Sequence, residues 1–122
     1  MELRRDKNTG REVSLLGFGC MRLPRPDPEK QEIDYELGKS MIDYAYRRGV
    51  SYFDTAYPYH EGLSELFIGK ALAEYPRESF CLADKMPGWL LHGREDAERI
   101  FAEQLKKLSL IHISEPTRPE RI

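Results

Sequence analysis

The sequence predicts an α/β protein. Short apolar segments begin near residues 15, 50 and 79, and each is followed by a longer segment with helical periodicity. Repeats of roughly 30 residues, each one strand and one helix, favour parallel strands joined by right-handed crossovers. The chain has 122 residues, whereas a complete eight-fold α/β barrel needs about 250. A three-stranded sheet would leave an open edge, so we expect the front part of a larger α/β protein.

Two kinds of strand are expected. Met1 to Arg4 and Arg11 to Val13 flank a turn with adjacent Asn, Thr and Gly residues, which favours a β-hairpin. Ser14 to Gly19 carries apolar residues on both faces, as a buried parallel strand does. Val50 to Phe53 and Ser79 to Ala83 are short, partly β-branched or aromatic runs, and we expect both to be strands of the same sheet.

Three helices are expected between and after these strands. The first spans Tyr35 to Arg48, because Gly49 fits the left-handed position that follows a helix. The second spans about Ser64 to Glu74, and the third about Glu95 to Leu108. Helical spacing predicts a buried stripe on the first helix made of Leu37, Met41, Tyr44 and Ala45.

Composition excludes several classes of function. Basic and acidic residues nearly balance, at 19 against 21, so we expect no nucleic-acid partner. No apolar run approaches the ~20 residues of a membrane span, and the first residues lack the apolar centre of a signal peptide. We therefore expect a cytoplasmic protein without a membrane partner. Cys20 and Cys81 lie far apart among apolar residues, and we expect two buried free thiols.

Reactive residue types collect directly after each expected strand. Gly19, Cys20, Met21 and Arg22 follow the first strand, the segment from Asp54 to His60 follows the second, and the segment from Asp84 to Pro87 follows the third. The carboxyl ends of parallel strands carry function in α/β folds, because side chains converge there on a rigid base.

These strand ends bring together an acid, a lysine and two tyrosines. An aspartate and a lysine at neighbouring strand ends hold each other charged. A tyrosine near such a lysine is expected to have a lowered pKa, because the ammonium favours the phenolate. Such a phenol can protonate a carbonyl oxygen while a hydride reaches the carbonyl carbon.

Four strings in order resemble the aldo-keto reductases. They are GFGCMRLP (Gly17 to Pro24), FDTAYPYH (Phe53 to His60), Ser64-Glu65 with FIGKAL (Phe67 to Leu72), and LADKMP (Leu82 to Pro87). The similarity spans about residues 1 to 108. It implies the N-terminal part of a (β/α)8 TIM barrel, a hairpin plus about three βα units. It also implies NADPH or NADH as cofactor and a small aldehyde or ketone as substrate.

The resemblance also implies roles for individual residues. Asp54, Tyr59 and Lys85 match the family's catalytic positions, with Tyr59 as general acid and the other two tuning it. Gly19, Cys20 and Met21 match the segment near the nicotinamide, which Asp54 also borders, and Arg22 is expected to contact substrate or cofactor. Tyr57 is expected to be structural, and His60 to shape the pocket or bond a loop.

The end of the chain departs from the family pattern. No acidic strand motif precedes His112, and prolines and arginines follow it, where the family has a strand that ends in a substrate-orienting histidine. The string SLIHISEPTRPE resembles a translated sequencing adapter. We therefore expect a partial barrel over residues 1–108 and a non-native or disordered tail over 109–122. We also expect this chain to be inactive alone, with any iron–sulfur cluster confined to the missing C-terminal part.

Two other functions remain open from the residues alone. One is a metal-dependent hydrolase on the same barrel, with Asp54, His60 and Lys85 around an ion. Metal ligation by Cys20, His60 and His92 has no recognised spacing, so we expect no metal. The other is a non-catalytic truncated domain that binds a nucleotide or a partner chain.

Overall fold

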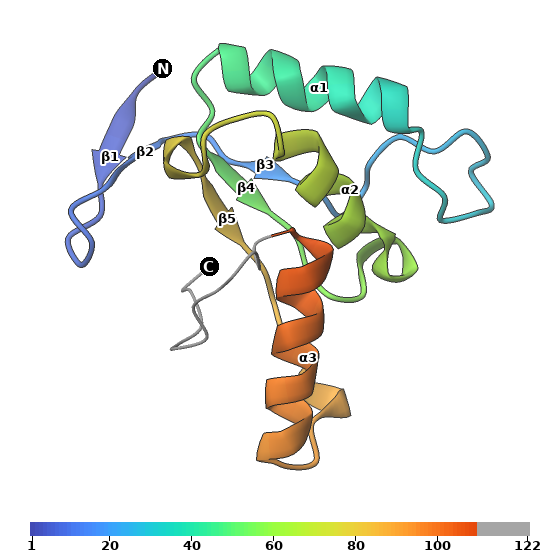
Figure 1. Cartoon of the computed structure of the whole chain (residues 1–122). Helices are drawn as coiled ribbons and strands as arrows, with labels where there is room; N and C mark the ends of the chain where they lie inside the picture. Colours follow the sequence, from blue (N-terminus) through green and yellow to red (C-terminus); the bar gives the residue numbers. More distant parts are fainter. Residues whose placement is uncertain (110–122) are drawn as a thin grey trace.

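The computed structural model describes residues 1–109 (Figure 1). Strands β1 (Leu3–Arg5) and β2 (Glu12–Ser14) form an antiparallel hairpin, and β3 (Phe18–Gly19), β4 (Tyr52–Asp54) and β5 (Cys81–Ala83) form a parallel sheet with β4 in the centre. The helices are α1 (Tyr35–Arg47), α2 (Leu63–Leu72) and α3 (Arg94–Lys107), with short 3-10 turns η1 (Tyr59–Gly62), η2 (Arg77–Ser79) and η3 (Gly88–Leu90). This order confirms the predicted α/β class and hairpin. The expectations for residues 110–122, His112 included, lie outside the described residues.

The two faces of the parallel sheet have different environments. Phe53 of β4 pairs in register with Leu82 of β5, and both side chains are buried together with Ile42 of α1 and Ile68 of α2. Figure 1 shows α1 and α2 on this side of the sheet. Side chains alternate along a strand, so those of Tyr52 and Asp54 lie on the opposite face of the sheet. Alternation therefore decides which residues at each strand end meet the helices.

The first parallel strand is shorter than predicted. Ser14 ends the hairpin, Leu15 and Leu16 are 56% and 60% exposed, and only Phe18–Gly19 pairs with β4. The prediction of a buried strand over Ser14 to Gly19 was therefore wrong for its first half. Leu15 still belongs to the hairpin side of the chain, since its N–H donates to the carbonyl oxygen of Glu2, and the Ser14 hydroxyl donates to the carbonyl oxygen of Leu16.

The predicted buried stripe of α1 was wrong for three of its four residues, since only Ala45 packs against the core. Leu37, Met41 and Tyr44 are 50%, 40% and 61% exposed, and the helix buries Gly38 and Ile42 instead. A Cβ atom at residue 38 would lie 2.8 Å from a ring carbon of Phe67 in α2. The absence of a side chain at this glycine lets the two helices approach closely, so this face and not the more apolar one meets the core.

The carboxyl end of α1 follows the predicted signal, and a side chain caps its amino end. The Asp34 carboxylate accepts the backbone N–H of Leu37 at the amino end, and Gly49 adopts a φ of +99° just past the carboxyl end. Across residues 1–109, none of the helices combines the length and the apolar content that a bilayer crossing requires.

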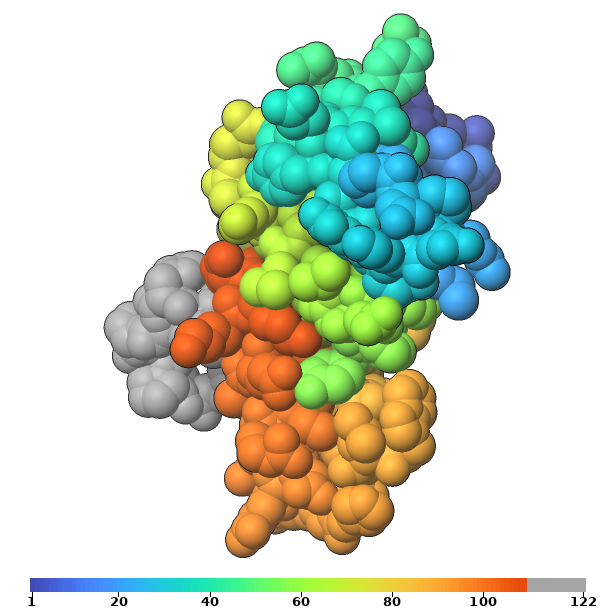
Figure 2. Space-filling model, turned by 90° about the vertical axis from the view of Figure 1, so that its right-hand side faces the viewer, coloured from blue at the N-terminus to red at the C-terminus, as the bar shows by residue number. Residues whose placement is uncertain are grey.

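The third helix extends the molecule in one direction. Figure 2 shows α1 and the first turns of α3 at opposite ends of the molecule, with α2 between them. The last turn of α3 packs on α2 at Gly69, where an added Cβ would lie 2.7 Å from the carbonyl oxygen of Lys107. This contact places polar side chains of α3 behind the carboxyl end of β5.

Candidate active site

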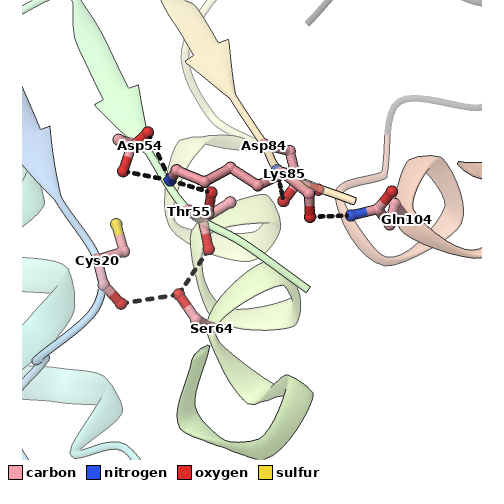
Figure 3. A network of polar contacts seen from close by, with 7 residues as sticks. All are labelled: Cys20, Asp54, Thr55, Ser64, Asp84, Lys85 and Gln104. Carbon is pink, nitrogen blue, oxygen red and sulfur yellow. Dashed lines mark hydrogen bonds and ion pairs between the residues drawn. The ribbon is translucent and has the colours of Figure 1, made fainter. Parts of the chain in front are cut away.

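An ion pair joins two neighbouring strand ends. Nζ of Lys85, which follows β5, lies 2.9 and 2.7 Å from the two carboxylate oxygens of Asp54, the last residue of β4. The same ammonium donates to the carbonyl oxygen of Thr55 at 3.0 Å (Figure 3). Both side chains are partly open to solvent, at 50% and 34% exposure. The pair is therefore accessible to a bound molecule.

Tyr59 lies beside this pair. It begins η1 in the loop after β4, and the Lys85 ammonium is 4.9 Å from the centroid of its ring. Burial acts to lower the pKa of Lys85, but hydrogen bonds with Asp54 and Tyr59 outweigh it and raise this pKa above its ordinary value. The structure thus brings Asp54, Tyr59 and Lys85 together, with the lysine held as a cation between the acid and the phenol.

The loop that carries Tyr59 is held by the next residue, His60. Its ring is buried, with Nε2 accepting the N–H of Leu23 at 2.9 Å and Nδ1 lying 3.1 Å from the carbonyl oxygen of Gln31. The two contacts imply a neutral ring with its proton on Nδ1. His60 also has a left-handed φ of 54°. His60 therefore ties the Tyr59 loop to the segment after β3.

The residues after β3 divide between surface and interior. Gly19 pairs in register with Asp54 and is exposed, as are Met21 and Arg22. The side chain of Cys20 is fully buried, and its backbone N–H donates to the carbonyl oxygen of Asp54. Burial, followed by the charge of Asp54, raises the pKa of the Cys20 thiol to about 12, so the group stays protonated and unreactive at neutral pH.

Both cysteines are free. Cys20 is buried as predicted, whereas Cys81 is only half-buried, because it lies on the sheet face that the helices leave uncovered.

Two hydroxyl groups beneath the ion pair connect α2 to the segments that follow β3 and β4. The Ser64 hydroxyl of α2 donates to the carbonyl oxygen of Cys20 at 3.0 Å and lies 2.7 Å from the hydroxyl of Thr55 (Figure 3). All three residues are fully buried. Buried hydrogen bonds of this kind fix the relative positions of the strand ends, so they set the place of Asp54.

A second buried group holds the backbone of Lys85. The Gln104 amide of α3 donates to the carbonyl oxygen of Lys85 at 2.9 Å and to Oε2 of Glu65 at 3.0 Å. Sequence reasoning assigned no role to Gln104 or Glu65. Strand alternation could have indicated this region, because it directs Lys85 away from the helices and Asp84 toward them.

Tyr57 does not join the ion pair. Its hydroxyl donates to the carboxylate of Glu103 in α3 at 3.1 and 3.2 Å, and Nζ of Lys107 lies 4.4 Å from its ring centroid. Burial, followed by the hydrogen bond to Glu103, raises the pKa of Tyr57. Tyr57 therefore links the β4 loop to α3, which fits the structural role expected of it.

A family model described as "Aldo/keto reductase family" matches residues 15–114. The chain belongs to this family. Among relatives of the aldo/keto reductase family, a probable aldo-keto reductase 1 from Glycine max is 40% identical over 114 residues, which cover 85% of this chain and 32% of that protein. The chain thus spans about a third of the length of this relative.

Solved aldo-keto reductases share the fold. A thermostable aldo-keto reductase in complex with epalrestat has a TM-score of 0.71 and 28% identity, covering 89% of this chain and 39% of that one. An aldo-keto reductase from Klebsiella pneumoniae in complex with NADPH has a TM-score of 0.68, 20% identity, and coverage of 82% and 33%. The hairpin and three strand–helix units therefore form part of the (β/α)8 barrel of this family, as predicted.

Proposed function

We propose that the protein to which these residues belong reduces aldehydes or ketones with NADPH or NADH. The observation that carries this proposal is the Lys85 ammonium between the Asp54 carboxylate, at 2.7 Å, and the Tyr59 ring, at 4.9 Å. Asp54, Tyr59 and Lys85 are its catalytic residues, and the substrate is a small carbonyl compound. The Klebsiella pneumoniae neighbour solved with NADPH supports the cofactor class.

Each of the three residues has a distinct part in the reaction. Tyr59 donates its hydroxyl proton to the carbonyl oxygen as negative charge develops there. The Lys85 ammonium stabilises the phenolate that remains, because the two groups interact in a partly desolvated site. Asp54 accepts two hydrogen bonds from that ammonium, which keeps it charged and directed toward the phenol.

The residues after β3 fit a nicotinamide ring. A Cβ atom at Gly19 would meet nothing within 4 Å, so the backbone beside Asp54 leaves open space for a flat ring. Met21 is 52% exposed and offers apolar surface, and the exposed Arg22 offers a cation for an anionic group. Cys20 would border the ring through its backbone, since its side chain is buried. When bound, the reduced nicotinamide supplies the hydride.

The test joins residues 1–109 of this chain to the remaining part of the Glycine max relative. We expect this chimera to consume NADPH in the presence of an aldehyde. The Tyr59→Phe variant should lower kcat by about 10²–10⁴-fold, the contribution typical of a positioned proton donor, while NADPH binding changes little. The rate is measured from the loss of reduced-nicotinamide absorbance.

Tyr57→Phe is the matched control, because it removes a phenol in the same loop that bonds Glu103 instead of Lys85. It should keep a rate close to that of the chimera. A Tyr59→Phe chimera that binds NADPH and reduces the aldehyde at the unmodified rate overturns the proposal.

The metal-dependent hydrolase has no support in the site geometry. Both ring nitrogens of His60 contact backbone groups of Leu23 and Gln31, so neither is free to bind an ion. Within residues 1–109, no three His, Cys, Asp or Glu residues lie together as a metal site requires. The binding-domain alternative stays a prediction, and titration of the chain with NADPH, followed by cofactor fluorescence, tests it.

Three further expectations accompany this proposal. A cytoplasmic location is supported by the free thiols of Cys20 and Cys81. The division into a partial barrel over residues 1–108 and a separate tail over 109–122 remains a prediction, as does an iron–sulfur cluster outside these residues.

A further inference from the structure

A buried and a half-buried carboxyl group meet behind Lys85. Glu65 of α2 is fully buried, and Asp84 precedes Lys85 and points to the helix side of the sheet through strand alternation. The two side chains are within hydrogen-bonding reach of each other. Oδ2 of Asp84 is buried without a hydrogen-bond partner among residues 1–109, and the buried Oε1 of Glu65 is contacted by the Lys107 ammonium. Buried polar atoms are rarely left without a partner.

The cations available do not balance two negative charges. Nζ of Lys107, from α3, lies 2.7 Å from Oε1 of Glu65 and forms an ion pair with it. Lys107 also faces Glu103 at 3.8 Å and is therefore shared. The Lys85 ammonium is bound to Asp54 on the other face, and the Gln104 amide next to Glu65 is neutral. Two adjacent carboxylates beside a single shared cation would repel each other in a desolvated space.

We propose that Asp84 and Glu65 share one proton, and that this pair positions the backbone of Lys85. The proton lies between the two carboxyl groups, which gives Oδ2 of Asp84 a partner and leaves one negative charge for Lys107. The catalytic value of positioning Lys85 rests on the proposed function, whereas the sharing of the proton by Asp84 and Glu65 is independent of it.

The pair holds Lys85 from both sides of its peptide backbone. Oδ1 of Asp84 accepts the backbone N–H of Lys85 at 2.8 Å, and Gln104 links Oε2 of Glu65 to the carbonyl oxygen of Lys85. Because the backbone N–H and carbonyl oxygen of Lys85 are both fixed, its side chain is directed toward Asp54 and Tyr59. Asp84 and Glu65 are therefore positioning residues.

The electrostatics of the site agree with this geometry. Burial raises the pKa of Asp84 to about 8, and the hydrogen bond and charge of Glu65 add to this, while the Lys85 N–H and Lys107 act in the opposite direction. The two carboxyl groups titrate as a coupled pair, so the ionisation belongs to both residues together.

Carboxyl ¹³C NMR of the purified protein tests the shared proton without cofactor or substrate. We expect one carboxyl of the pair to stay protonated well above the ordinary aspartate pKa of 3.8 and to ionise near 8. In Glu65→Gln, Asp84 loses its charged neighbour and should ionise at lower pH. Asp84 and Glu65 both ionising in the ordinary carboxyl range of the unmodified protein overturns the proposal.

Stability against pH gives a second readout. Asp84 binds its proton more tightly folded than unfolded, so stability is fully present below pH 3.8 and is lost as pH rises toward about 8. The folding equilibrium constant should fall by up to about tenfold per pH unit in that window. Asp84→Asn keeps an N–H donor for Glu65 and a carbonyl acceptor for Lys85, so it should remove this pH dependence. Glu32→Gln, at an exposed acid, should leave it unchanged.

The positioning role has its own readout, which is the titration of Lys85 followed by ¹⁵N NMR. Burial acts to lower the pKa of Lys85, and the bonds of Lys85 with Asp54 and Tyr59 outweigh this effect and raise the pKa. Asp84→Ala should lower this pKa, and Asp84→Asn should restore it. An unchanged Lys85 titration in a folded Asp84→Ala protein overturns the positioning role. If Asp84→Ala does not fold, a changed Lys85 titration in the Asp84→Asn protein overturns the positioning role instead. The proposed function would fail in the aldehyde assay instead, so the two failures are distinguishable.

Discussion

Adjacent residues at the strand ends have opposite environments. Lys85 is half-exposed and bonds Asp54, while Asp84 points to the buried helix side. On β4 the same alternation leaves Asp54 open and buries Thr55 against Ser64. A two-residue period follows from the pleat of a strand, so one short segment supplies both a reactive side chain and the support beneath it.

At the residue scale, we predict that His60→Ala loosens the loop that carries Tyr59. The change leaves the Leu23 N–H and the Gln31 carbonyl oxygen without their ring partner. A buried group left unpaired costs about 1–3 kcal/mol. The free energy of unfolding should fall by about that amount for each group, and the Leu23 amide should exchange its hydrogen faster. His92→Ala, at an exposed histidine, is the control, and equal effects of the two variants contradict the prediction.

Close helix contacts at glycines decide how the elements pack. Gly38 of α1 meets Phe67, and Gly69 of α2 meets the last turn of α3. The hydrophobic periodicity of α1 predicted a different buried stripe, of which the structure leaves Leu37, Met41 and Tyr44 exposed. Periodicity identifies a helix well, but the face that is buried depends on which partner helix can approach, and that information is not local.

At the element scale, we predict that Gly69→Ala separates α2 from α3. The added Cβ would lie 2.7–2.9 Å from backbone atoms of Lys107 and Leu108, which cannot move as a flexible side chain can. Overpacking of this kind costs about 1–3 kcal/mol, measured as a lower free energy of unfolding in urea. Gly88→Ala meets nothing within 4 Å and should change stability little. A Gly69→Ala protein as stable as Gly88→Ala contradicts the prediction.

The whole molecule has uncovered apolar surface over its described residues. In the sheet order β3-β4-β5, the outer edge of β5 pairs with no strand among residues 1–109. A hollow of about 270 Å³ beside it is lined mainly by apolar residues, including Ile68, Leu72 and Leu82. Trp89 is 67% exposed. Exposed apolar patches mark interaction surfaces or lower the solubility of a protein.

At the scale of the whole molecule, we predict that the 122-residue chain binds the apolar dye ANS. The dye should enter the hollow beside β5 and increase in fluorescence. In the chimera with the Glycine max relative, further strands and helices cover this surface, so the enhancement per molecule should be several-fold smaller. Equal dye fluorescence from the two proteins contradicts the prediction, and equal protein concentrations serve as the control.

The α/β class, the hairpin, and the place of Asp54, Tyr59 and Lys85 at neighbouring strand ends are predictable from the amino-acid sequence, because these features depend on local periodicity and on the order of elements. The buried face of α1, the start of the first parallel strand, and the bonds that link Glu65 and Gln104 to the backbone of Lys85 follow from the three-dimensional packing. These features depend on contacts between residues far apart in the chain, and no local pattern encodes how closely two helices approach.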